Sequence, residues 1–182
     1  MTKITDLIDR WNTNEGKPYK GSLIDKRSYE DGNLSCMCAQ GQVLHVVGGW
    51  SAERLLDAEQ ADVDKATAKL LNISRAHAIL LRNINDSVDG APAIVLTDPG
   101  AVLGDQWSKL LDFWWHMDGL DGYGWRKVAA AGDAAGAAAS EIQGAEIFKR
   151  EGTPFVFLPM FGFASPDDIP ARPADYGVTS ND

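Results

Sequence analysis

Cysteine is scarce in this sequence, which has only Cys36 and Cys38 among its 182 residues. A secreted domain stabilised by disulfides needs more cysteines, and a Cys-x-Cys pair rarely closes on itself without strain. We therefore expect two reduced thiols in a reducing compartment. A single Cys-x-Cys, without a second pair of ligands at zinc-site spacing, also predicts that no metal is bound.

Long hydrophobic runs and positive charge are also lacking. No apolar run approaches the roughly 18 residues of a membrane span, and the first residues lack the charged and apolar regions of a signal peptide. Lys and Arg number 17 against 26 Asp and Glu, which gives a net charge of -9. Non-specific binding to nucleic acid requires the opposite balance. We expect a soluble cytoplasmic protein without membrane or non-specific nucleic-acid partners.

Several motifs of common enzymes are absent too. The sequence contains no phosphate-binding P-loop, no dinucleotide fingerprint, no Gly-x-Ser-x-Gly and no His-Glu-x-x-His. These absences disfavour the common cofactor-dependent enzymes. We therefore expect no cofactor, and we favour a binding protein over an enzyme.

The length of 182 residues and the hydrophobic content of 45% fit one globular domain. Apolar residues at helical spacing predict a series of helices. Their ranges are 3–11, about 38–47, 51–56, 62–71, 75–85, 105–117 and 125–150. We expect a single domain over 1–172, with sub-regions 1–104 and 105–164, followed by a flexible acidic tail over 173–182.

Two segments predict β-structure. Asp31-Gly32 favours a tight reversal between extended runs near 19–25 and 34–36, so a β-hairpin is expected there. A strand, confined to a sheet edge by neighbouring prolines, is expected where aromatic residues alternate at Phe155, Phe157, Phe161 and Phe163. The expected fold class is therefore α+β and mainly helical, with a short N-terminal hairpin packed among helices and a C-terminal edge strand.

A ridge of small residues marks the expected helix over 125–150. It consists of Gly132, Gly136, Ser140 and Gly144, each four residues apart and so on one helix face. Glycine costs roughly 1 kcal/mol against alanine in a helix interior, so close approach of another backbone would have to compensate. The ridge predicts either a tight crossing within the chain or the interface of a homo-oligomer. A low-complexity run without a partner is a third interpretation.

Cys38, His77 and Asp86 form the one set of residues that could support nucleophilic catalysis. A helix start stabilises a thiolate, a histidine could act as its base, and a carboxylate could orient that histidine. The alternative is a small buried thiol and an ordinary histidine, and we favour it because the spacing around His77 is helical. Asn85-Asp86 could likewise hold a polar ligand or simply end a helix, and we favour the helix end.

Aromatic residues are abundant, with six Trp in the chain. Most should fill the core, but an aromatic cavity that stacks a flat ligand is the sharper alternative. A nucleotide would also need a local group of cations, such as Lys17, Lys20, Lys26 and Arg27. The candidate ligand-binding residues are Trp11, Tyr19, Lys20, Lys26, Arg27, Cys38, Gln40, Asn85 and Asp86.

The first half of the chain contains a Trp at the end of a helix, a Gly, a turn with Asp and Gly, a Cys and a Gly that open a helix, and an Asn-Asp step. These are Trp11, Gly21, Asp31-Gly32, Cys38, Gly41 and Asn85-Asp86. In this pattern it resembles a family of small uncharacterised bacterial and phage proteins. Many members have Trp-Asn-Asp where this chain has Ile84-Asn85-Asp86.

The second half contains Glu141-Ile142-Gln143-Gly144 after an Ala/Gly/Asp-rich segment, and later a run from Gly162 to Asp168. It is similar to tailed-phage proteins with the same features. The resemblance implies a phage or prophage source, and hence the cytoplasm of the host cell. We expect an accessory protein that captures a small host molecule, such as a nucleotide defence signal, or a host protein. A cysteine hydrolase and a structural virion component are the alternatives.

Overall fold

The computed structural model describes residues 3–34, 36–87, 92–117, 158 and 162–177. The elements over these residues are helical, and none of the residues lies in a strand. The first five elements are α1 (Lys3–Asn12), α2 (Lys26–Glu30), α3 (Ala39–Gln42), the π-helix η1 (Val43–Val47) and α4 (Ala52–Leu56). Those that follow are α5 (Gln60–Leu71), α6 (Arg75–Ser87), α7 (Pro92–Thr97), α8 (Pro99–Leu103), α9 (Trp107–Met117) and the 3-10 turn η3 (Pro166–Asp168).

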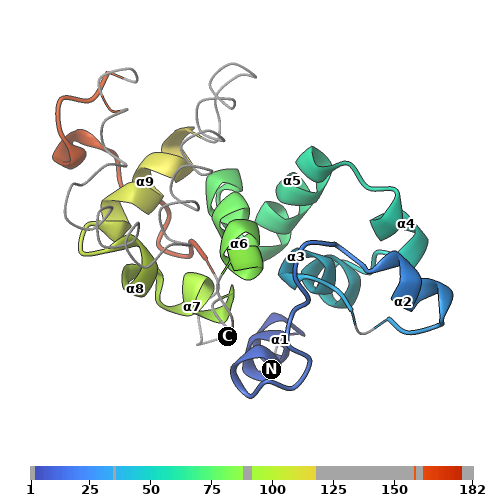
Figure 1. Ribbon diagram of the computed structural model, residues 1–182. Coiled ribbons are helices and arrows are strands. Elements are labelled where there is room, and N and C mark those ends of the chain that lie inside the picture. The colour runs from blue at the N-terminus through green and yellow to red at the C-terminus, as the bar shows by residue number, and fades with distance from the viewer. Residues whose placement is uncertain (1–2, 35, 88–91, 118–157, 159–161, 178–182) are drawn as a thin grey trace.

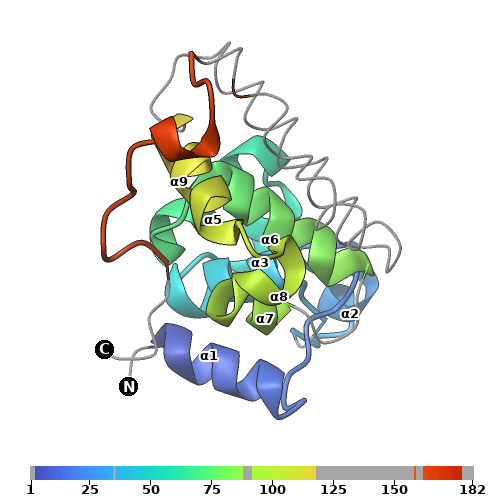
Figure 2. The same ribbon diagram turned by 90° about the vertical axis from the view of Figure 1, so that its left-hand side faces the viewer.

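Helix α6 occupies the centre of the fold. In Figure 1 it separates α7, α8 and α9 from α3, α4 and α5, and it contacts α3, α5, α7 and α9. Its side chains at Ala76, Ala78, Leu80 and Leu81 are fully buried. Figure 2 shows α1 crossing one end of this bundle beside α7. These apolar residues of α6 belong to the larger of two clusters of buried hydrophobic residues. The smaller cluster lies beside α4 and consists of Ile24, Met37, Leu44, Ala52, Leu55 and Val63.

The sequence correctly predicts most of these helices. The expected helices over 3–11, 38–47, 51–56, 62–71, 75–85 and 105–117 match α1, α3 with η1, α4, α5, α6 and α9, with bounds that differ by a few residues. Ser51 caps α4 as expected, because its Oγ accepts a hydrogen bond from the backbone N–H of Arg54 at 3.3 Å. The helix expected over 125–150 lies outside the described residues.

The expectation of an N-terminal β-hairpin is wrong. Asp25 instead caps a helical turn, because its Oδ1 accepts from the backbone N–H of Ser28 at 2.8 Å. The resulting helix α2 lies directly after the first expected strand, 19–25, and ends before the expected return strand, 34–36. Flanking segments do exchange backbone hydrogen bonds, from Tyr19 to Met37 and from Cys38 to Ser22, but these bonds do not follow the regular register of a ladder.

The expected C-terminal edge strand is also wrong for the residues that the structure describes. The backbone N–H of Phe163 donates to the carbonyl of Leu158 at 3.2 Å, which closes a local turn rather than a ladder. The chain then enters η3, whose capping Ser165 is bonded to Asp168. The fold class is therefore mainly helical rather than α+β, and Phe155, Phe157 and Phe161 lie outside the described residues.

Residues 173–177 belong to the segment expected to be a flexible tail, yet Tyr176 is only 9% exposed. Its hydroxyl accepts from the backbone N–H of Ser74 at 3.2 Å. Nearby, the side chain of Asn72 donates to the carbonyl of Asp175 at 2.7 Å. Asn72 takes the left-handed conformation that ends α5. The start of α6 thus provides the docking place for this part of the C-terminal segment.

Candidate functional site

Asn85 and Asp86 are brought together with Tyr19, as the candidate ligand set requires, but their polar groups bind the backbone. Asn85 Oδ1 accepts from the N–H of Ala39 at 3.2 Å, and its Nδ2 donates to the carbonyl of Tyr19 at 2.9 Å. Asp86 Oδ1 accepts from the N–H of Gly21 at 2.9 Å. These bonds fix the end of α6 to the segment before α2. The contacts of Asn85 and Asp86 are thus with the protein's own backbone, but they join segments distant in the chain rather than cap the helix end.

Gln40 lies in a second buried network, between α3, α5 and α6. Its Nε2 donates to Asp64 Oδ1 at 2.9 Å and to the carbonyl of Ala78 at 3.1 Å. Arg82 reaches the same carboxylate, with Nη1 3.2 Å from Asp64 Oδ2. Gln60 closes the network by donating to Asp64 Oδ1 at 3.0 Å. The negative charge of the Asp64 carboxylate is thereby paired with Arg82, and its oxygens accept hydrogen bonds, as burial of a charge requires.

The remaining candidates lie elsewhere. Trp11 is buried, and its indole N–H donates to Gln42 Oε1 at 2.9 Å. Lys26 and Arg27 are exposed on α2, where Lys26 lies 4.0 Å from Glu30. Lys20 is exposed in the segment before α2. These placements describe a core tryptophan and surface cations rather than one enclosed ligand site.

Cys38 caps α3, as the sequence predicts for a cysteine at a helix start. Its Sγ accepts from the N–H of Gly41 at 3.4 Å. The residue is only 6% exposed, and burial raises the pKa of its thiol to about 11 although the hydrogen bond from Gly41 acts in the opposite direction. Burial therefore keeps the sulfur in its protonated, unreactive form at neutral pH.

His77 has both ring nitrogens bonded within the core. Nε2 lies 2.9 Å from the carbonyl of Val95, and Nδ1 lies 3.0 Å from the hydroxyl of Tyr176. A carbonyl can only accept, so Nε2 carries the proton and Nδ1 accepts from Tyr176. Burial lowers the pKa of His77 to about 4. No ring nitrogen is left to accept a proton from Cys38, so we do not propose the cysteine hydrolase.

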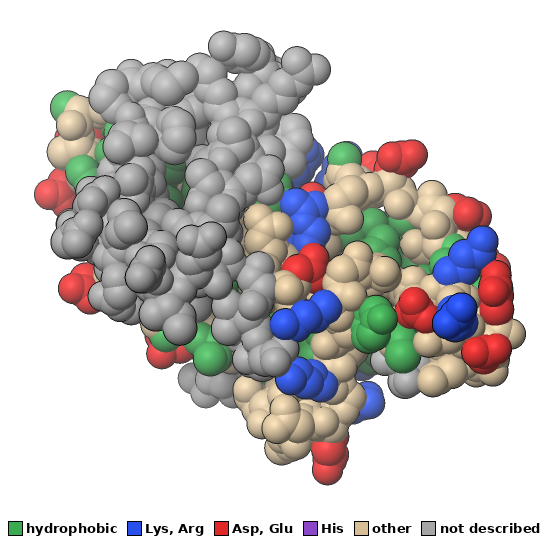
Figure 3. All heavy atoms as spheres, viewed as in Figure 1, with side chains coloured by type: hydrophobic (Ala, Val, Ile, Leu, Met, Phe, Trp, Pro, Cys, Tyr) green, Lys and Arg blue, Asp and Glu red, His purple; other side chains and the backbone are tan. Residues whose placement is uncertain are grey.

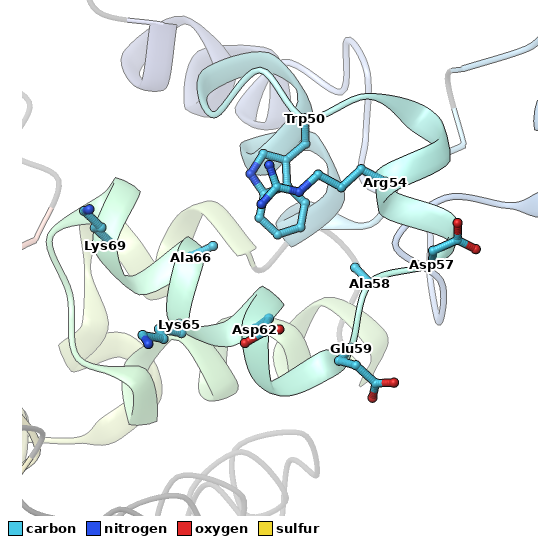
Figure 4. A pocket seen from close by; sticks show the side chains of 9 residues that line it. All are labelled: Trp50, Arg54, Asp57, Ala58, Glu59, Asp62, Lys65, Ala66 and Lys69. Carbon is cyan, nitrogen blue, oxygen red and sulfur yellow. The ribbon is translucent and has the colours of Figure 1, made fainter.

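A groove between α4 and α5 offers a different site. Its volume is about 660 Å³, which lies within the range of pockets for small ligands. One side is formed by Trp50 and Arg54, and the connection between the helices adds Asp57, Ala58 and Glu59. The opposite wall is the face of α5 that presents Asp62, Lys65, Ala66 and Lys69. Figure 4 shows these side chains around the groove.

The π-helix η1 positions Trp50 at the groove. Nδ1 of His45 in this turn lies 2.7 Å from the carbonyl oxygen of Trp50, which can only accept, so the imidazole donates this hydrogen bond. The backbone N–H of Trp50 in turn donates to the carbonyl of Leu44 at 3.0 Å. π-Helical turns are rare in proteins, and those that occur often lie at functional sites. Close packing holds this turn against α5, since a Cβ at Gly48 would lie 2.8 Å from Leu70 Cδ1.

Arg54 stacks on the indole ring of Trp50. Its guanidinium carbon lies 3.6 Å from the ring centroid, which is a close cation–π contact. Arg54 is exposed and Trp50 is half-buried. One planar face of the guanidinium is thus occupied by the ring, and the stack lies beside the space between α4 and α5 (Figure 4). A flat, positively charged platform of this kind suits a planar anion.

Both signs of charge line the groove. Lys65 and Lys69 are one turn apart on α5, Asp62 lies nearer the start of the same helix, and Asp57 and Glu59 lie on the connection to α4, to the right of the lysines in Figure 4. Figure 3 likewise shows basic and acidic side chains intermixed over α2 and α4. Trp50 is not among the candidate ligand-binding residues, and the sequence gives only a general signal for this site, its abundance of tryptophan. No local sequence pattern indicates that Arg54 and α5 form the rest of this groove.

Comparison of the chain with protein-family models, curated proteins and solved structures finds no match. The resemblance to phage proteins therefore stays a prediction. Among the described residues, no group of three or more His, Cys, Asp or Glu side chains is placed to hold a metal. Within the same ranges, no helix has both the length and the apolar content that crossing a bilayer requires. The small-residue ridge from Gly132 to Gly144 lies outside the described residues, and with it the predicted homo-oligomer interface.

Proposed function

We propose that the protein binds a small, planar, anionic molecule of the size of a mononucleotide in the groove between α4 and α5. The observation that carries the proposal is the Arg54 guanidinium stacked 3.6 Å from the Trp50 ring centroid at the wall of this groove. A planar ring can stack on the exposed face of the guanidinium, and a cation–π contact of this kind is worth about 0.5–2 kcal/mol.

Lys65 and Lys69 supply the second part of the site. They are exposed, four residues apart on α5, and both line the groove. Side chains at this spacing are neighbours on the helix surface, so their ammonium groups are able to bind oxygens of the same phosphate. The net charge of -9 opposes long-range attraction of an anion, which makes these local cations essential to the proposal.

In a phage protein, such binding would withdraw a nucleotide signal of the host from solution. That role rests on the resemblance stated for the sequence, and the groove supports only the capture of the ligand. Capture without conversion agrees with the positions of Cys38 and His77, whose buried contacts give neither residue a catalytic part.

Isothermal titration of the full chain with GMP, AMP and uncharged adenosine tests the proposal. We expect binding of a nucleotide and little binding of adenosine. Arg54→Ala should weaken nucleotide binding about tenfold, because it removes a cation–π stacking partner worth about 0.5–2 kcal/mol. The double variant Lys65→Ala/Lys69→Ala should weaken it further.

The matched control is Lys26→Ala/Arg27→Ala on α2, which removes the same charge outside the groove. This control should bind as the wild type does. Equal losses in both double variants would show that net charge rather than the groove controls binding. Absence of binding by every nucleotide would refute the proposed function.

A further inference from the structure

We propose that Asp62 makes the groove selective for guanine among the nucleotide bases, an inference that rests on the proposed function. Asp62 is exposed in the first turn of α5 and lines the groove. In Figure 4 it lies on the same wall as Lys65 and Lys69, nearer the start of the helix. The α5 wall thus carries an acceptor at one end and two cations toward the other.

The spacing along α5 allows a mononucleotide to reach from the two lysines to Asp62. Lys65 and Lys69 lie three and seven residues after Asp62, which corresponds to about 5 and 10 Å along the helix axis. A nucleotide whose phosphate binds Lys65 and Lys69 would place its base toward Asp62, beside the Trp50–Arg54 stack on the opposite side. The base edge would then meet a carboxylate rather than an ammonium group.

A carboxylate discriminates between bases by what it can accept. It offers two acceptor oxygens and no donor when ionised. Guanine presents two adjacent donors on one edge, the ring N1–H and the 2-amino group, and these match a carboxylate in pairs. Adenine presents a single amino donor next to a ring nitrogen that is an acceptor, so a carboxylate faces an unfavourable lone pair there.

The test compares GMP, IMP and AMP by isothermal titration against wild type and Asp62→Asn. IMP lacks the 2-amino group, so its affinity shows what the hydrogen bond from the ring N1–H contributes on its own. Wild type should bind GMP at least tenfold more tightly than AMP, with IMP between them. Asp62→Asn should reduce this preference to less than threefold, mainly by weakening the binding of GMP. The reason is that an amide has one acceptor oxygen and one donor nitrogen, so it cannot accept from both donors of guanine as a carboxylate does.

Glu30→Gln is the matched control, because it removes one negative charge at an exposed residue of α2, outside the groove. This variant should retain the preference for GMP. Equal affinity for the three nucleotides in wild type, lost in Arg54→Ala, would overturn the selectivity and leave the proposed function intact. Loss of the preference in a control instead of Asp62→Asn would overturn the assignment to Asp62.

Discussion

Acidification should destabilise this protein through His77 well before the pKa of that residue in the fold is reached. Burial lowers the pKa of His77 to about 4 from an ordinary value of 6.5, and the positive charge of Arg172 acts in the same direction. The unfolded chain therefore binds the proton at a higher pH than the folded chain does. Stability is unaffected by this group above about pH 6.5 and falls as the pH decreases toward 4.

The magnitude follows from the difference of about 2.5 pKa units. At 1.36 kcal/mol per unit, the loss reaches about 3 kcal/mol at pH 4, which is a large part of the usual stability of a domain. The structural reason is that protonated His77 would present an N–H at Nδ1 in place of the acceptor for Tyr176. The hydroxyl of Tyr176 would then lose the acceptor for its own proton, although it would still accept from the backbone N–H of Ser74.

Urea denaturation, followed by tryptophan fluorescence from pH 7 to pH 4, measures this effect. His77→Gln is the comparison, because its amide can donate to Val95 and accept from Tyr176 without titrating. The free energy of unfolding of wild type should decrease by about 3 kcal/mol relative to the variant over this range. Parallel curves for the two proteins would refute the reasoning. If the variant does not fold, NMR titration of wild-type His77 decides, since a midpoint near 6.5 would be equally contradictory.

Three further changes test other parts of the fold. Gly41→Ala should lower the melting temperature strongly, because its Cβ would lie 1.9 Å from the carbonyl oxygen of Leu23; calorimetry with an unchanged transition would contradict this contact. Cys38 should react with iodoacetamide at pH 8 only after denaturation, because burial raises its pKa to about 11; rapid labelling of the native thiol, measured by mass spectrometry, would be inconsistent with its burial. Asp64→Ala should cost about 1–3 kcal/mol in urea denaturation, because it removes the carboxylate that accepts from the buried side chain of Gln40 and pairs with Arg82, and no measurable loss would show that this network contributes little.

The sequence predicts helices well where apolar spacing and capping agree. In α1, the buried Leu7, Ile8 and Trp11 lie on the face expected from their spacing. It fails at the hairpin because Asp25 can cap a helix as readily as Asp31-Gly32 can form a tight turn. The backbone of Leu23, just before α2, also lies closely against Gly41, and local preferences cannot predict such a contact between residues distant in the chain.

The candidate site is predicted less well for a related reason. Asn85, Asp86 and Tyr19 are brought together as expected, but their polar groups join backbone segments. The groove depends on Trp50 and Arg54 lying opposite α5, and Trp50 is held there by hydrogen bonds to the π-helix that precedes it. No periodicity in the sequence distinguishes a π-helix from the end of an α-helix, so the site becomes visible only in three dimensions.

Chemical-shift mapping during titration with GMP tests the central claim most directly, because it locates the ligand rather than measuring its affinity alone. The account predicts that the indole N–H of Trp50, the side chain of Arg54 and the backbone of α5 shift together and saturate at one concentration. Shifts centred on Asn85 and Asp86, or on Lys26 and Arg27, with Trp50 unchanged, would contradict the groove as the binding site.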